Sequence, residues 1–135
     1  MRAARAYKSV SDSTSVMSND SLGLVILLYE RLLQRILETE LAINVRDIES
    51  RSRASSAAIQ IINEGLIGAL DMEQGGDIAK KLRAHYLQWI TLLMQCNMRG
   101  DATLLDTLRE NVLELLSAWQ QLKQLDRNEG VTVPK

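Results

Sequence analysis

The sequence has very few of the residues that interrupt helices, and this scarcity favours a helical protein. The single proline of the 135 residues is Pro134, so no proline breaks a helix before that point. Phenylalanine is absent, and aromatic residues make up only 4% of the chain. A core built mainly of Leu, Ile, Val, Met and Ala suits helices packed side by side, because these side chains interdigitate along helix ridges.

Residues that bind metals or form disulfides are also nearly missing. Cys96 is the one cysteine, which excludes an internal disulfide and fits a reducing compartment. His85 is the one histidine, and Leu82 stands where a di-iron bundle would need glutamate. Because zinc sites need several Cys or His ligands, we expect neither a metal nor a cofactor.

Signals of catalysis are weak. The pair Gly75-Gly76 lacks the Lys-Ser/Thr ending of a phosphate-binding loop. Asp71 and Glu73 could act as an acid and a base, but capping of helices around a turn explains them more simply. Cys96 falls on an apolar helix face, where a free cysteine acts as a small buried hydrophobe. We therefore expect that the protein is not an enzyme.

Charge and hydropathy argue against two further classes of partner. The net charge is −1, so no basic field attracts nucleic acid. The longest uninterrupted apolar run, Leu24 to Tyr29, is far shorter than the ~20 residues of a membrane span. No secretory signal is readable at the N-terminus. We expect a cytoplasmic protein that binds no nucleic acid and inserts into no membrane.

Apolar residues recur at helical spacing in four segments, which predict four helices. These segments cover approximately residues 21–44, 47–70, 77–98 and 101–125. The links between them are short, so consecutive helices run antiparallel, as in an up-down four-helix bundle. The predicted organisation is all-α, with a flexible N-terminal arm over 1–18, the bundle over 19–125 and a short, polar, disordered tail over 126–135.

Capping residues mark the links between these helices. Asp20 and Asp47 are placed to accept hydrogen bonds from the first turns of the first two helices. Gly100 is placed to end the third helix, directly before Asp101 as the cap of the fourth. We expect the turn in the middle of the chain to be formed by Asp71, Gly75, Gly76 and Asp77.

Four patches of the sequence resemble flagellin-specific export chaperones. The run from Leu70 to Leu82 resembles the leucine-aspartate, glycine-glycine-acid-isoleucine-alanine turn of that family and is the most specific of the four. The other three patches agree with the family in order and spacing and are Ala6-Tyr7-Lys8, Leu27-Leu28-Tyr29-Glu30 and Ala118-Trp119. The similarity extends from Ala6 to Leu122. One departure is the link over residues 44–47, which lacks the glycine frequent in the family.

The resemblance implies a cytoplasmic chaperone that binds the C-terminal segment of flagellin. That segment is disordered before assembly and helical in the filament, and the chaperone prevents its premature polymerisation and keeps it ready for flagellar type III export. Components of the export gate are possible further partners. We expect the chaperone itself to be a monomer or a weak dimer. The resemblance also implies that the N-terminal arm covers the empty binding groove, and Tyr7 is the arm residue that matches the family. The alternative is that the arm is a passive tail.

A bundle needs its innermost apolar stripe for itself, so contacts with a partner should come from the neighbouring strips. Leu24 and Leu28 are expected to be core residues, whereas Gly65 and Gly68 are expected to let another helix approach closely. The predicted partner-binding residues are Tyr7, Ser55, Ala58, Ile61, Gly65, Gly68, Tyr86, Ile90 and Leu93. A chaperone or adaptor for another helical secretion client, and a self-associating bundle, remain alternative interpretations.

Overall fold

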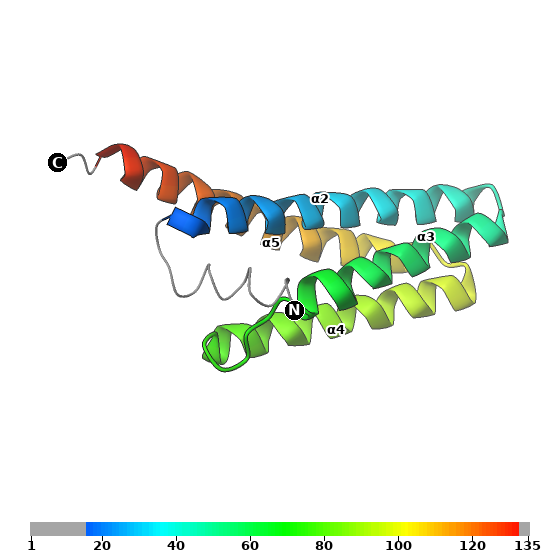
Figure 1. The fold of residues 1–135 in the computed structure, drawn as a ribbon. Coiled ribbons are helices and arrows are strands. Elements are labelled where there is room, and N and C mark those ends of the chain that lie inside the picture. Colours follow the sequence, from blue (N-terminus) through cyan, green and yellow to red (C-terminus); the bar gives the residue numbers. More distant parts are fainter. Residues whose placement is uncertain (1–15, 133–135) are drawn as a thin grey trace.

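A computed structural model describes residues 16–132, with side chains described from 22 to 127 (Figure 1). Its elements are α2 (Val16–Asn44), α3 (Ile48–Gln60), the π-helix η1 (Ile61–Ile67), α4 (Gly76–Arg99) and α5 (Thr103–Thr132). Because η1 continues α3, this part of the chain forms four rods that alternate in direction, and it contains no strand. The predicted all-α four-helix fold is confirmed.

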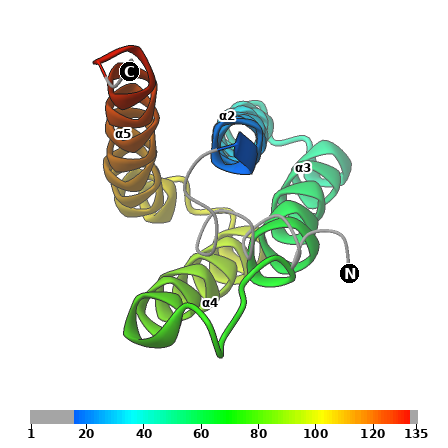
Figure 2. The same ribbon diagram turned by 60° about the vertical axis from the view of Figure 1, so that its left-hand side comes forward.

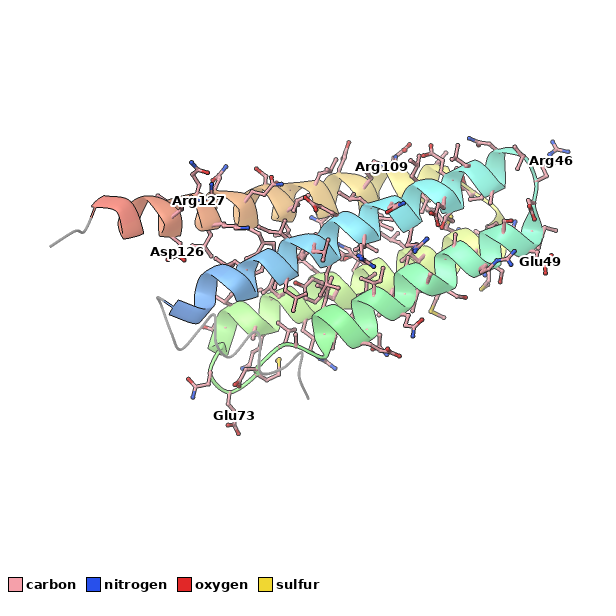
Figure 3. All side chains as sticks on the ribbon, turned by 45° about the horizontal axis from the view of Figure 1, so that its top comes forward. Arg46, Glu49, Glu73, Arg109, Asp126 and Arg127 are labelled. Carbon is pink, nitrogen blue, oxygen red and sulfur yellow. The ribbon has the colours of Figure 1, made fainter. Side chains whose placement is uncertain are left out.

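Each rod packs on two of the other three. α2 packs on the α3–η1 rod and on α5, and α4 packs on the same two rods. The rods α2 and α4 therefore lie at opposite corners of the bundle, as do α3 and α5 (Figure 2). Arg46 and Glu49 mark the end of the bundle that carries the α2–α3 link, and Glu73 marks the opposite end (Figure 3).

The core contains a cluster of aromatic side chains that joins three of the rods. Tyr29 of α2 stacks edge-to-face on Tyr86 and Trp89 of α4 and on Trp119 of α5, with ring centroids 5.8–6.4 Å apart. The hydroxyl groups of Tyr29 and Tyr86 are 2.8 Å apart and share a hydrogen bond. Burial raises the pKa of Tyr29 to about 12, although this hydrogen bond partly opposes the shift.

Aliphatic side chains from all four rods surround this cluster. Full burial of each large aliphatic side chain stabilises the fold by roughly 1.5–3 kcal/mol relative to exposure. The fully buried aliphatic residues include Leu32, Ile36, Ile62, Leu66, Leu93, Leu105, Leu108 and Val112. The link between η1 and α4 adds Ala69 and Leu70 to this core, and the helix faces supply the rest.

Two helices are longer than the sequence predicted. α2 begins at Val16, so Asp20 lies inside the helix and the prediction of Asp20 as its N-cap is wrong. No residue between Val16 and Asp20 opposes helix formation strongly enough to end it there. α5 continues past residue 125 to Thr132.

The predicted caps of the other helices are confirmed. The Asp47 carboxylate accepts hydrogen bonds from the backbone N–H and the hydroxyl of Ser50, at 3.1 and 2.8 Å. Gly100 ends α4 in the left-handed conformation, with φ of 65°. Asp101 accepts from the N–H and hydroxyl of Thr103, at 3.0 and 2.6 Å. These hydrogen bonds lower the pKa of both Asp47 and Asp101.

The links of the bundle adopt two distinct geometries. In the link between η1 and α4, Asp71 accepts hydrogen bonds from the N–H groups of Glu73 and Gln74, at 3.1 and 3.0 Å. Gly76 follows with φ of 55°. In the α2–α3 link, Arg46 takes φ of 60°, a left-handed conformation that glycine adopts without steric cost. This is the link in which the sequence lacks the expected glycine.

The π-helix η1 was not predicted from the sequence. Its end is marked by a hydrogen bond from the Gly68 N–H to the carbonyl oxygen of Asn63, five residues earlier, at 3.1 Å. The buried residues Ala58, Ile62 and Leu66 recur every four positions. This spacing exceeds the 3.6 residues of an α-helical turn, and the wider π turn keeps these side chains directed at the core.

Candidate functional site

A cleft of about 410 Å³ opens between α2 and the α3–η1 rod. It is lined by Leu28, Arg31, Arg35, Ala57, Gln60, Ile61, Glu64 and Gly65. Gly65 brings the two rods close together, because a Cβ atom at this position would lie 3.3 Å from Leu28 Cδ1. The absence of a side chain at Gly65 therefore leaves room for Leu28 and for the cleft above it.

A second cleft of about 540 Å³ follows along the same two rods, nearer the α2–α3 link. It is lined by Arg35, Glu38, Ser50, Arg53, Ala54 and Ala57. Arg35 and Ala57 line both clefts, so the two form one continuous depression, which we call the α2–α3 groove. Figure 2 shows that α2 and α3 lie side by side, and α5 lies on the other side of α2.

The groove has a floor of small residues and a partly apolar wall. Ala54, Ala57 and Gly65 present little or no side chain, while Leu28 and Ile61 supply half-buried apolar surface. The apolar surface continues along α2 beyond the groove. Its further members are Leu24, 46% exposed, and Leu27, 43% exposed. Small floor residues permit close approach by another helix, and an apolar wall favours a helix with an apolar face.

The rim of the groove carries charges of both signs. Arg31, Arg35 and Arg53 provide three positive charges, and Glu38 and Glu64 provide two negative charges. Arg35 Nη1 lies 2.7 Å from Glu38 Oε1, with both side chains partly exposed. Exposed ion pairs of this kind contribute about 0–1 kcal/mol, so these side chains can exchange partners at little cost.

Comparison with known proteins tests the family resemblance that the sequence patches indicated. The sequence profile of the family described as "Flagellar protein FliS" matches residues 3–126. The flagellar secretion chaperone FliS of Salmonella typhimurium is 32% identical over 118 residues, which cover 87% of each chain. The flagellar secretion chaperone FliSB of Pseudomonas aeruginosa is 33% identical over 119 residues, 88% of this chain and 94% of that protein.

This chain belongs to the FliS family. Membership confirms the function predicted from the sequence, that of a flagellar secretion chaperone, and it confirms that the protein is not an enzyme. The FliS of Escherichia coli, 25% identical over 120 residues, shows that the similarity also extends to more divergent members.

Two of the patches that resembled the family meet in the aromatic cluster. Tyr29 comes from the patch on α2 and Trp119 from the patch on α5, and their ring centroids are 6.3 Å apart. A third patch forms the link in which Asp71 caps the turn and Ala79 is buried at the start of α4. These three patches therefore help to hold the bundle together, and one of them also supplies Leu28 to the wall of the groove. Ala6 and Tyr7 lie outside the described residues.

Other polar and reactive side chains of the described part serve the fold. Asn111 on α5 accepts a hydrogen bond from Trp89 Nε1, at 2.6 Å, and pairs with His85 Nδ1, at 3.1 Å, so it ties α5 to α4. Cys96 is buried, and burial raises the pKa of its thiol to about 11, so the thiol stays protonated near neutral pH. Residues 16–132 contain no group of three or more potential metal ligands and no helix able to cross a membrane.

The structure divides the predicted partner-binding residues into three groups. Ile61 and Gly65 line the α2–α3 groove. Gly68 is exposed where η1 ends, and Ile90 is half-buried on α4, outside the groove. The remaining described residues are fully buried in the core and are Ser55, Ala58, Tyr86 and Leu93. Tyr7 lies outside the described residues.

The buried members of this set are already used by the bundle. Tyr86 shares a hydrogen bond with Tyr29, and the Ser55 hydroxyl donates to the Ser52 carbonyl oxygen at 3.2 Å. Ala58 and Leu93 pack among the apolar core residues. In this conformation none of the four presents a side chain to a partner.

Sequence reasoning missed most of the α2 side of the groove. Leu24 and Leu28 were expected in the core, but Leu24 is 46% exposed and Leu28 is half-buried in the groove wall. The core direction of α2 is set by Val25, Tyr29 and Leu32. Leu24 is rotated by about 100° from Val25, since an α-helix has 3.6 residues per turn. The breadth of the apolar face of α2, wider than one core-facing stripe needs, is the signal that could have identified this surface.

Proposed function

We propose that the α2–α3 groove is where this FliS family member holds a helix of the C-terminal segment of flagellin. The observation that supports this most directly is the pair of clefts that share Arg35 and Ala57, because together they follow the rods rather than forming an isolated pocket. An elongated groove fits a helix laid along it, and a small compact ligand would leave most of it empty.

The composition of the groove suits an amphipathic client. Leu28 and Ile61, with Leu24 and Leu27 beyond them, would cover the apolar face of the incoming helix. The charged rim would pair with its polar face, and the Arg35–Glu38 pair can open for this purpose. A client that orders itself on binding gives up conformational entropy, so it can contact a large surface and still be released for export.

Further partner contacts extend this proposal. Ile90 and Gly68 are exposed or half-exposed away from the groove and could contact later parts of the client. The N-terminal arm with Tyr7 would cover the groove when no client is bound. The core residues Ser55, Ala58, Tyr86 and Leu93 would reach a client only if the rods separated, so they are left out of the proposed surface.

We place this activity in the bacterial cytosol, since a client must be held before it enters the export apparatus. The complex would then deliver the client to components of the export gate. A monomer or weak dimer suits this role, because a tight dimer through α2 or α3 would cover the groove that the client needs.

Calorimetric titration with a peptide of the C-terminal segment of the organism's flagellin tests the proposal. Ala57→Leu places a leucine in the floor shared by both clefts, whereas Ser56→Leu adds the same side chain at an exposed neighbouring position. Leucine and alanine have similar helix propensities, so Ala57→Leu should keep α3 intact. We expect Ala57→Leu to weaken binding by about tenfold or more, a loss of about 1.4 kcal/mol or more, and Ser56→Leu to have little effect.

Equal binding by wild type and Ala57→Leu would refute the groove as the client site. Failure of the flagellin peptide to bind wild type, with binding of a helical segment from another flagellar protein, would instead favour the alternative client. Circular dichroism of each variant verifies that the helical content is unchanged.

A further inference from the structure

The helix α4 carries a second apolar stripe that the bundle does not use. Its inner stripe, with Tyr86, Trp89 and Leu93, is fully buried in the core. A second set recurs at alternating intervals of three and four residues on another face, and all of its members are exposed. This set, which we call the outer stripe, consists of Ala84, Leu87, Thr91, Met94 and Met98.

The exposure of the outer stripe increases toward the end of α4. Leu87 is 41% exposed, Met94 53% and Met98 79%. Thr91 lies between them and donates its hydroxyl hydrogen to the Leu87 carbonyl oxygen at 3.1 Å, so its methyl group remains as the outward apolar surface. Residues spaced in this way form the narrow seam by which one helix packs along another. The outer stripe therefore fits a helix better than it fits a loop or a small molecule.

The charges at the two ends of the stripe indicate which helix fits. α4 contains four basic residues, of which Lys80, Lys81 and Arg83 precede the stripe and Arg99 follows it, and the single acidic residue Asp77 in its first turn. No Asp, Glu, Lys or Arg lies between residues 84 and 98. None of the ion pairs among the side chains from 22 to 127 involves α4, although Arg99 lies near enough to Asp101 to help lower its pKa. This concentration of positive charge is local, because the whole chain carries a net charge of −1.

These observations point to one occupant. We propose that the outer stripe of α4 binds an acidic amphipathic helix of a second partner protein, whose apolar residues repeat at the same spacing and are flanked by Asp or Glu. Two copies of α4 would bring basic side chains against each other, and like charges beside such a seam oppose pairing. The charge pattern therefore argues against self-association through this face and in favour of an acidic partner.

The position of the stripe allows both partners to bind at once. The α2–α3 groove involves α2 and the side of α3 next to it, and α4 lies diagonally opposite α2 (Figure 2). No residue of the outer stripe lines either cleft of the groove. The protein can therefore hold its client on one face while the basic face of α4 contacts another protein. This inference rests on the client site proposed above and requires that flagellin leave the outer stripe free.

A designed peptide can probe this face even though the natural partner is unidentified. The probe is a labelled helix of about four heptads with leucine at the a and d positions and glutamate at e and g. Repulsion between glutamates keeps the peptide from pairing with itself. A matched peptide with lysine at e and g has the same apolar face and opposite charge. Fluorescence anisotropy with the full chain measures the affinity of each peptide.

We expect the acidic peptide to bind about tenfold or more tightly than the basic one, with an affinity that falls as salt is added. Met94→Glu should reduce binding of the acidic peptide about tenfold or more, because it places a charge within the stripe. Leu113→Glu on α5 is the matched control, since Leu113 is 46% exposed but lies on another rod. The double variant Lys80→Glu/Arg83→Glu should reverse the preference between the two peptides.

Four results would overturn the proposal. Equal binding of the acidic and basic peptides would mean that charge does not select the partner. An unchanged affinity in Met94→Glu would show that the acidic peptide binds elsewhere. Displacement of the acidic peptide by a saturating flagellin peptide would show that the face belongs to the client rather than to a second partner. Sedimentation of the wild type as a dimer that Met94→Glu dissociates would also contradict it.

Discussion

Leu28 of α2 packs directly over the bare backbone of Gly65 in η1, where a Cβ atom would lie only 3.3 Å from its Cδ1 atom. This contact brings together two elements that are far apart in the sequence and sets the depth of the groove between them. The same position shows why a glycine stands in the interior of a helix despite a cost of about 1 kcal/mol relative to alanine. A larger residue would displace Leu28 or fill the cleft.

Gly65→Leu should therefore weaken client binding without unfolding the bundle. The added side chain competes for the space that Leu28 and the client helix share, and the gain in helix propensity offsets part of the crowding. We expect the affinity for the flagellin peptide to fall by about tenfold or more in calorimetric titration. Asn63→Leu, at an exposed position of the same π-helix, serves as the control and should bind like wild type. Unaltered affinity in Gly65→Leu would count against the groove.

The hydroxyl groups of Tyr29 and Tyr86 should stabilise the core as a pair, so that the effects of removing them are not additive. Replacing either residue by phenylalanine removes one hydroxyl and with it the hydrogen bond between these two buried groups, a cost of about 1–3 kcal/mol. Removing both hydroxyls should cost less than the two single losses combined. Urea denaturation of the wild type, both single variants and the double variant measures this coupling. Strictly additive losses would mean that the two hydroxyl groups do not depend on each other.

Alkaline pH should destabilise the bundle partly through Cys96. Burial raises the pKa of its thiol to about 11 from the ordinary value of 9.0, so above pH 9 the unfolded chain loses this proton before the folded chain does. Below about pH 9 the thiol is protonated in both states, and its contribution to the free energy of unfolding is complete. Between about pH 9 and about pH 11 this contribution is lost, and the free energy of unfolding falls by up to about 1.4 kcal/mol per pH unit.

The test compares denaturation midpoints of wild type and Cys96→Ala between pH 8 and about pH 11. Cys96→Ala leaves a cavity and should be less stable at every pH. Its midpoint should nevertheless fall less steeply with pH than that of the wild type. Parallel decreases in the two proteins would show that Cys96 does not contribute to the pH dependence.

The strained α2–α3 link offers a stabilising substitution. Arg46 has φ of 60°, a conformation that costs an ordinary residue roughly 1–2 kcal/mol and costs glycine almost nothing. Arg46→Gly should raise the free energy of unfolding by up to about 1 kcal/mol, after allowance for the greater freedom of glycine in the unfolded chain. A thermal unfolding scan measures the change, with Arg46→Ala as the control that should not be stabilised. Destabilisation by glycine would mean that the arginine side chain stabilises the link.

Most of the fold followed from the sequence because helix spacing and capping are local properties. The caps at Asp47 and Gly100 were identified correctly, since each depends on a few neighbouring atoms. The start of α2 at Val16 was missed because Asp20 resembles a cap although the helix continues through it. The π-helix was also missed, because its wider turn depends on which residues the other rods bury.

The groove could be predicted only in part. Ile61 and Gly65 were identified, but Tyr86 and Leu93 proved to be core residues. Helical periodicity gives the angles between side chains around one rod, but it does not reveal which neighbour each angle faces. Tyr86 is buried because α2 brings Tyr29 within hydrogen-bonding distance of it, a contact 57 residues away in sequence. Such contacts become visible only when the rods are assembled.

The central claim is that the client helix lies in the groove between α2 and α3. The most direct measurement is a pair of amide and methyl NMR spectra of the isotope-labelled chain, recorded with and without a saturating flagellin peptide. We predict the largest shifts at Leu28, Ala57, Ile61 and Gly65. Unchanged resonances at these residues, with shifts confined to α4 and α5, would contradict the claim.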